Sequence, residues 1–226
     1  MMITRRLSII ALSACLLQVL FSCTNEGYDT GDGNLSYLCA DFVEARTSAD
    51  AVIKSVVTDD GTTLSLSRGL KPAWASVPDT VYRALLYYSK HGSPVAPLSI
   101  ARVPVAVPHT QNDSLFTDPM EVESVWTSAN GKYVNISLLL KTGMPDSLDQ
   151  RQWVSVVYDP EAAVPSRSLL LLHSQNGVPE YYTTRMYVSV PVSFFPSQDS
   201  LCIRVNTYDG MKKYVARLSA PFVEPS

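Results

Sequence analysis

Short apolar runs with alternating polar residues make up most of the chain after residue 34. The runs are rich in Val, Ile, Leu and Tyr, and clusters of Gly, Pro, Asn and Asp separate them. Alternation with a period of two places successive side chains on opposite faces of a strand. Convincing helical periodicity is absent from this part of the sequence. The pattern therefore predicts an all-β protein.

The first five runs predict a small barrel. Asp59-Asp60-Gly61 joins the second run to the third as a hairpin turn, because glycine readily adopts the positive φ that such a turn needs. Five strands fit a barrel of the oligonucleotide/oligosaccharide-binding (OB) type. We expect this OB-like domain to cover residues 35–107. Its runs are 35–46, 51–58, 62–67, 80–90 and 94–107.

Seven further runs predict an antiparallel β-sandwich. The turn dipeptides Asn130-Gly131, Asn176-Gly177 and Asp209-Gly210 punctuate them, at a spacing typical of a sandwich. The stretch 107–114 is polar and contains a proline, so it predicts a domain boundary, with the sandwich domain at residues 108–226. The runs are 121–127, 132–141, 152–158, 168–174, 181–194, 200–208 and 213–219.

The N-terminal segment has the layout of a lipoprotein signal peptide. Arg5-Arg6 precede an uncharged apolar stretch at residues 7–21, which is shorter than the roughly 20 residues of a comfortable membrane span. It ends in Leu20-Phe21-Ser22-Cys23, which resembles a lipobox, although Phe21 is bulkier than the usual residue. We expect cleavage after residue 22 and lipid attachment to the thiol of Cys23. An ordinary secretory signal with a chance cysteine is the alternative.

A lipidated Cys23 predicts attachment to a membrane. Each buried acyl CH₂ contributes roughly 0.8 kcal/mol, and stable anchoring takes more than one chain. Residues 23–34 are polar and rich in Gly and acid, which predicts a flexible tether. The expected location is the bacterial outer membrane, with the folded part in the periplasm or at the cell surface.

The charge of the chain argues against nucleic acid as a partner. The formal net charge is −3 and becomes −5 when the leader, with its two arginines, is removed. Lys212-Lys213 is the densest cationic pair, so phosphate backbones are repelled rather than bound.

Two cysteines, Cys39 and Cys202, remain outside the N-terminal segment, each in a strand-like run. We expect two buried free thiols, packed as small apolar groups, and a disulfide between them, which an oxidising compartment would permit, is the alternative. Neither has a Cys-x-x-Cys spacing, so no metal site is expected.

Five stretches of the chain have a recognisable pattern, at residues 58–64, 81–88, 125–136, 173–176 and 181–185. These stretches resemble the NigD-like lipoproteins of Bacteroidetes-type Gram-negative bacteria. The resemblance implies an OB-like barrel followed by a β-sandwich, as the strand pattern predicts. The short link 69–79 departs from the family pattern, because it leaves little room for the helix that many OB barrels have at this place. The family has no established enzymatic activity; its name comes from bacteriocin production, so a protective role is one implication.

The sequence carries no pattern that identifies a catalytic site or a cofactor. His91 and His109 lie in loop-like stretches, and His173 ends an apolar run, where a structural hydrogen bond is the expected role. Gly-x-Ser-x-Gly, His-Glu-x-x-His, phosphate-binding and calcium-binding patterns are lacking. We therefore expect a protein that is not an enzyme, with a hydrolase site at the domain junction as the alternative.

Exposed aromatic rings are candidates for a binding surface. We single out Trp74, Tyr88, Trp126 and Tyr182, with core packing as the alternative for each ring. In each of the pairs 87–88 and 181–182, one ring is expected in the core and the other outside.

Four Asp-Ser/Thr-apolar tripeptides are candidate O-glycosylation sites, as bacteria of this group modify such sequons in the periplasm. Turn formation by Asp and Ser explains the same tripeptides equally well. The acceptor residues would be Thr80, Ser114, Ser147 and Ser200.

These features together predict a lipid-anchored, non-enzymatic binding or accessory module of the cell envelope. Its partner would be an envelope protein, a peptide or a glycan. Protection against a toxin or bacteriocin is a further alternative.

Overall fold

The computed structural model describes residues 37–110, 116–145, 147, 149–164, 167–195 and 199–218. These residues form twelve β-strands and one short 3-10 helix, η3 (Val192–Phe194), so the predicted all-β class is confirmed.

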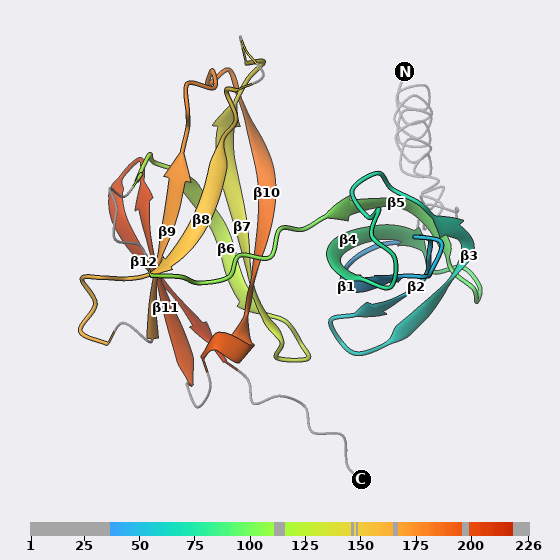
Figure 1. The fold of residues 1–226 in the computed structure, drawn as a ribbon. Coiled ribbons are helices and arrows are strands. Elements are labelled where there is room, and N and C mark those ends of the chain that lie inside the picture. The colour runs from blue at the N-terminus through green and yellow to red at the C-terminus, as the bar shows by residue number, and fades with distance from the viewer. Residues whose placement is uncertain are drawn as a thin grey trace, which may run out of the picture. The chain divides into compact units, whose positions relative to one another are not determined.

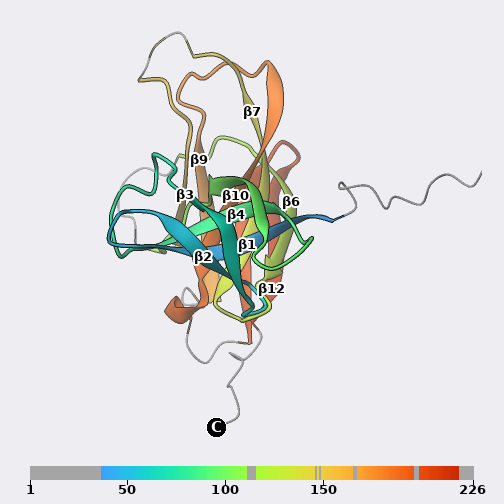
Figure 2. The same cartoon turned by 90° about the vertical axis from the view of Figure 1, so that its right-hand side faces the viewer.

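Five strands form the OB-like barrel. They are β1 (Leu38–Thr47), β2 (Ile53–Thr58), β3 (Thr63–Leu70), β4 (Val81–Ser89) and β5 (Ala96–Arg102), hydrogen-bonded in the order β3-β2-β1-β4-β5. A parallel bridge between Leu66 and Val95 joins the two ends of this order, because the Ser67 amide donates to the Val95 carbonyl at 2.8 Å. The sheet thereby curls into the barrel seen in Figures 1 and 2, and the predicted OB-like architecture is confirmed.

The barrel core follows from the alternation within its strands. Val43 and Ala45 of β1 point inward with Ile53 and Val56 of β2, and all four are at most 1% exposed. Burial of such side chains gives roughly 1.5–3 kcal/mol for each large one. Gly61 adopts φ +87° in the β2–β3 turn, as the sequence predicts.

Seven strands form two sheets that pack as a sandwich. One sheet has the order β10-β7-β6, from β6 (Glu121–Thr127), β7 (Tyr133–Thr142) and β10 (Tyr182–Pro191). The other has the order β12-β11-β9-β8, from β8 (Trp153–Tyr158), β9 (Ser168–Ser174), β11 (Ser200–Thr207) and β12 (Gly210–Arg217). Apolar residues of both sheets share one core, with Ile136 and Leu138 on β7 and Leu171 and Ile203 on the second sheet.

One strand pair departs from the expected antiparallel pairing. Strands β9 and β11 are parallel, with Ile203 opposite Leu169 and Val205 opposite Leu171. The chain leaves for the other sheet as β10 and returns as β11, so β11 runs in the same direction as β9.

The connection between barrel and sandwich is hydrogen-bonded to sandwich strands. The Ala106 amide donates to the Ser189 carbonyl of β10 at 2.9 Å, and the Tyr158 amide of β8 donates to the His109 carbonyl at 3.1 Å. This segment therefore extends the sandwich sheets rather than running free.

Cys39 on β1 and Cys202 on β11 are free, half-buried thiols. The expected signal peptide, the lipidated Cys23 and the tether at residues 23–34 lie outside the described residues. Among the residues that the structure describes, no helix is long and apolar enough to cross a membrane.

Candidate functional site

A pocket of about 390 Å³ lies where β1 and the β2–β3 turn of the barrel meet the end of β6. Its size falls at the lower end of the range for small-ligand sites, roughly 300–1,000 Å³. Barrel and sandwich both contribute to its walls. The lining residues are Ala40, Asp41, Phe42, Thr58, Asp59, Asp60, Trp126, Thr127, Ser128 and Ala129.

Aromatic rings form one side of this pocket. Phe42 of β1 meets Trp126 of β6 edge to face, with ring centres 5.5 Å apart and an interplanar angle of 72°. Tyr187 of β10 packs against both rings, 5.2 Å from Phe42 and 6.4 Å from Trp126. Such edge-to-face contacts each add about 0.5–1.5 kcal/mol beyond area burial, so the rings hold one another in place.

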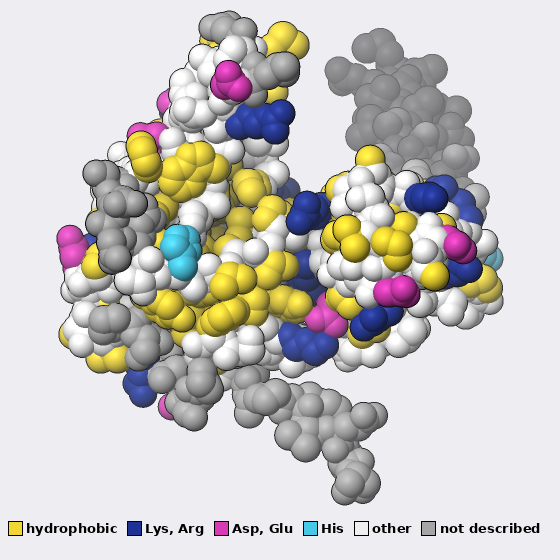
Figure 3. Space-filling view, in the orientation of Figure 1, with side chains coloured by type: hydrophobic (Ala, Val, Ile, Leu, Met, Phe, Trp, Pro, Cys, Tyr) yellow, Lys and Arg dark blue, Asp and Glu magenta, His cyan; other side chains and the backbone are white. Residues whose placement is uncertain are grey.

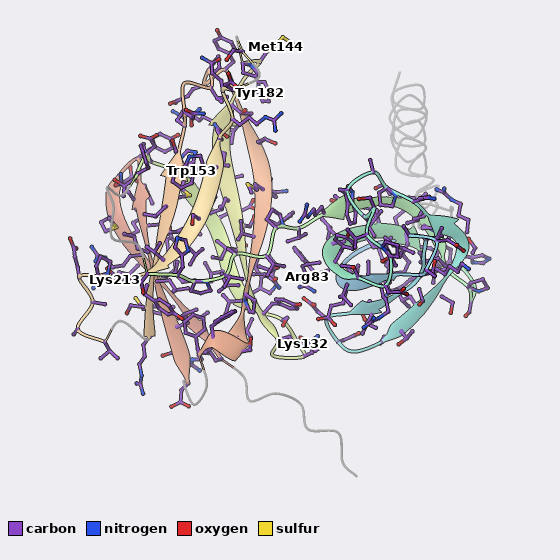
Figure 4. All side chains as sticks on the ribbon, in the orientation of Figure 1. Arg83, Lys132, Met144, Trp153, Tyr182 and Lys213 are labelled. Carbon is purple, nitrogen blue, oxygen red and sulfur yellow. The ribbon has the colours of Figure 1, made fainter. Side chains whose placement is uncertain are left out.

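A buried arginine lies behind the pocket. Arg83 of β4 has a side chain that is 1% exposed, and its guanidinium donates to both oxygens of the Asp59 carboxylate, at 2.5 and 2.7 Å. It also donates to Asn135 Oδ1 at 3.2 Å and to Ser189 Oγ at 3.3 Å. Because Asn135 and Ser189 belong to β7 and β10, Arg83 connects the barrel to the sandwich. Figure 4 labels its position.

Tyr133 and Glu44 extend this polar network. The guanidinium of Arg83 lies 4.3 Å from the centre of the Tyr133 ring, a favourable cation–π distance. The Tyr133 hydroxyl donates to Glu44 Oε1 at 3.0 Å, and Lys132 Nζ donates to Glu44 Oε2 at 2.8 Å. Burial, followed by the negative charge of Glu44, raises the pKa of Tyr133 to about 12. Burial alone would raise the pKa of Glu44, but its hydrogen bonds from Lys132 and Tyr133 outweigh this and lower it.

Two further carboxylates line the pocket. Asp41 Oδ2 accepts a hydrogen bond from the Tyr88 hydroxyl at 2.7 Å. Asp60 accepts from the Thr58 hydroxyl and, at 2.9 Å, from the Thr62 amide, and these bonds lower the pKa of Asp60. Within the described part of the chain, neither Asp41 nor Asp60 forms a salt bridge, whereas Asp59 pairs with Arg83.

Hydroxyls, carboxylates and aromatic rings line the pocket. Its hydroxyls are engaged, since Ser128 Oγ donates to Asn130 Oδ1 at 2.8 Å and Thr58 bonds Asp60. None of its lining residues is a histidine, and its carboxylates are the groups there that could serve as a base. Across the described ranges, no group of His, Cys, Asp and Glu is arranged to hold a metal ion.

The four aromatic residues predicted to bind a ligand lie in different parts of the structure. Trp126 lines the pocket. Trp74 is half-buried beside the barrel core and meets Tyr82 edge to face. Tyr88 is 1% exposed, so its selection as a surface ring is wrong: it faces inward toward the barrel core, and its neighbour Tyr87 is exposed instead. Tyr182 is 60% exposed.

The second tyrosine pair does not follow the expected alternation. Tyr181 and Tyr182 are 79% and 60% exposed, because Tyr182 begins β10 and Tyr181 precedes it, beyond the sandwich core. Figure 4 shows Tyr182 and Met144 together at one end of the sandwich, away from Arg83. Hydrophobic side chains gather over the middle of the sandwich face shown in Figure 3.

The three histidines do not gather into a site. His91 and His109 are exposed, as expected for loop residues. His173 is 1% exposed, and its ring Nδ1 lies 3.3 Å from the Asp118 carbonyl, which supports the expected structural role. Burial lowers the pKa of His173.

The candidate glycosylation sites differ in accessibility. Ser147 and Ser200 are exposed, whereas Thr80 is half-buried and its hydroxyl donates to the Pro78 carbonyl at 2.9 Å. Ser114 lies outside the described residues. Modification at these positions stays a prediction.

Sequence reasoning missed the network of Arg83, Asp59 and Asn135. The one available signal was an arginine inside the apolar run 81–88, where a buried charge requires a partner. The partners themselves lie 24 and 52 residues away.

Solved structures share this barrel-and-sandwich fold. A NigD-like immunity protein from Bacteroides caccae aligns with a TM-score of 0.60 and 24% identity, over 78% of this chain and 91% of that one. A toxin-related protein from Parabacteroides distasonis has a TM-score of 0.60 and 16% identity, over 79% and 91% of the two chains. A predicted lipoprotein from Bacteroides fragilis has a TM-score of 0.55 and 11% identity, over 81% and 99%.

The shared fold supports the resemblance to NigD-like proteins that the sequence indicates. No protein-family model matches the sequence, and no curated protein matches it.

Proposed function

We propose that this chain is a lipid-anchored NigD-like protein of the bacterial outer membrane that acts as a binding module, with the pocket between β1 and β6 as its binding site. The single observation that carries the proposal is this pocket, in which rings and carboxylates from two sheets converge. Its partner would be an envelope protein, a peptide or a glycan. Lipid attachment at Cys23 would raise the local concentration of the site at the membrane.

Two observations support the envelope location. The residues up to Cys23 have the order of a lipoprotein signal peptide. A structure with the same fold is described as a predicted lipoprotein, which agrees with that reading.

The proposal is tested by filling the pocket. Ala129 is exposed on the rim, so Ala129→Trp places a bulky ring there without removing a core side chain. Ala73→Trp is the matched control, because Ala73 is also an exposed turn residue but does not line the pocket. The lipidated proteins are used to capture partners from native envelopes, and the bound fractions are compared by mass spectrometry.

We expect the wild type and Ala73→Trp to retain the same partner and Ala129→Trp to lose it. If all three proteins retain the same set, or none retains anything but lipid and abundant porins, this pocket is not a binding site for an envelope partner.

Protection against a toxin is a second candidate function. The observation that favours it is the shared fold with a protein described as a NigD-like immunity protein. Deletion of the gene should then raise the sensitivity of the cell to a bacteriocin of neighbouring strains, and unchanged sensitivity across a panel of such strains would count against protection.

A hydrolase at the same junction is the alternative from another class. It would need a base and a free nucleophile, and the lining hydroxyls of Thr58 and Ser128 are already hydrogen-bonded. Turnover of a peptide or glycoside library that Ala129→Trp abolishes and Ala73→Trp does not would favour this alternative.

A further inference from the structure

The charge of the pocket restricts its ligand. Three carboxylates line it, and only Asp59 is neutralised, by Arg83. Asp41 and Asp60 have no cationic partner among the described residues, and the nearby Lys132 is paired with Glu44. An anionic ligand would be repelled, whereas a cation would find two carboxylates that are already in place.

The aromatic wall favours the same kind of ligand. Tryptophan is the side chain whose ring face attracts cations most strongly, and Trp126 lines the pocket together with Asp41 and Asp60. The protein already uses this interaction nearby, because the guanidinium of Arg83 lies 5.3 Å from the centre of the Phe42 ring. An alkyl stem could pack on the rings while its charged end reaches a carboxylate.

From this combination of cavity, rings and charge we infer that the pocket binds an organic cation with an alkyl stem, namely an alkylammonium or a guanidinium group. A lysine or arginine side chain of a partner polypeptide and a free amine both present this chemistry. The volume of about 390 Å³ is small for a larger ligand but sufficient for one such group. The inference deepens the proposed function, since it names the ligand class of the same site.

The test titrates the full mature protein with small probes. Nα-acetyl-lysine methylamide and Nα-acetyl-arginine methylamide represent the side chains, norleucine and citrulline analogues are their neutral counterparts, and butylamine represents a free amine. Binding is followed through the NMR signal of the Trp126 indole N–H, assigned with Trp126→Phe.

Three variants separate the contributions. Asp41→Asn and Asp60→Asn keep the oxygen that accepts from Tyr88 or Thr58 but remove the charge. Asp50→Asn is the matched control, because Asp50 is an exposed barrel carboxylate outside the pocket. Unfolding curves of each variant verify that the fold is retained.

We expect the charged probes to bind at least about tenfold more tightly than their neutral counterparts, with weakening at high salt. Asp41→Asn together with Asp60→Asn should remove this preference, and Asp50→Asn should not. Equal binding by butylamine identifies a free amine as a sufficient ligand, whereas tighter binding by the acetylated amides identifies a polypeptide source.

Equal affinity for charged and neutral probes, or unchanged affinity in the double variant, overturns the inference. Its failure can be told apart from failure of the proposed function. If Ala129→Trp abolishes envelope capture while the double Asp variant captures normally, the pocket binds a partner but not through a cation. If neither variant changes capture, the pocket itself is misassigned.

Discussion

Arg83 lies at the contact between barrel and sandwich, and its replacement by alanine gives the sharpest measure of how strongly the two are joined. The substitution removes two hydrogen bonds to Asp59 and one each to Asn135 and Ser189. It also removes the stacking of the guanidinium on Tyr133. Asp59, whose side chain is 17% exposed, then keeps its negative charge without a counter-ion.

The expected loss is about 3–5 kcal/mol of unfolding free energy, the range for breaking a buried ion pair by removing one partner. The cation–π contact accounts for roughly 1 kcal/mol of this, so the uncompensated carboxylate dominates. Asp59→Ala should cost at least as much, because it leaves the guanidinium of Arg83 unpaired at 1% exposure. Arg83→Met combined with Asp59→Ala should cost much less than the two single losses together, since no buried charge then remains.

Urea unfolding of the mature chain, followed by circular dichroism and tryptophan fluorescence, measures these losses. Arg204→Ala is the internal comparison, because it breaks the ion pair with the fully buried Asp159 without touching the junction. The Arg204 variant should be destabilised while the environment of Trp126 is unchanged. An Arg83→Ala variant within about 1 kcal/mol of the wild type would refute the reasoning, since it would show that the Arg83–Asp59 pair is not buried in solution.

Three further predictions concern single side chains. Burial lowers the pKa of His173 below its ordinary value of 6.5. The neutral His173 therefore contributes its full stability above about pH 6.5, and this contribution is lost as the pH falls. In His173→Leu, the free energy of unfolding should fall less with decreasing pH in this range. Because the pKa of Tyr133 is raised to about 12, its contribution to stability should be full below about pH 10 and decline between pH 10 and 12. In Tyr133→Phe, unfolding curves should show a smaller decline in stability, and the rise of tyrosinate absorbance should lose one titrating group. Cys23→Ser should move the protein from the membrane to the soluble fraction on cell fractionation, and a variant that stays with the envelope as firmly as the wild type would show that no lipid is attached there.

Most strand positions could be predicted because the alternation of apolar and polar residues within a strand decides which of its faces is buried. Strands β6 (Glu121–Thr127) and β9 (Ser168–Ser174) have the predicted limits. The run 181–194 was predicted too long at its end, because the chain turns into η3 after Pro191. Apolar residues continue through that turn, so the pattern alone gives no sign of the end of the strand.

Pairing between distant strands could not be predicted, because it depends on the topology of the whole chain. The parallel pair β9–β11 and the closing bridge between Leu66 and Val95 involve residues that carry no local signal of their partners. The position of the pocket also depends on the topology of the whole chain. Trp126 was singled out as an aromatic residue, but its place beside Asp41 and Asp60 follows only from the packing of β6 against the barrel.

Asp59 links the stability of the junction to the occupancy of the pocket, because the same carboxylate lines the cavity and pairs with Arg83. A ligand that contacts both β1 and β6 binds only while the barrel and the sandwich remain joined. Saturation at 100 times the dissociation constant should therefore stabilise the folded state by about 2.7 kcal/mol. Thermal unfolding with and without the cationic probe measures this gain, and Ala129→Trp should show none. A gain of equal size in Ala129→Trp would mean that the probe binds elsewhere, and that the junction and the pocket are not linked.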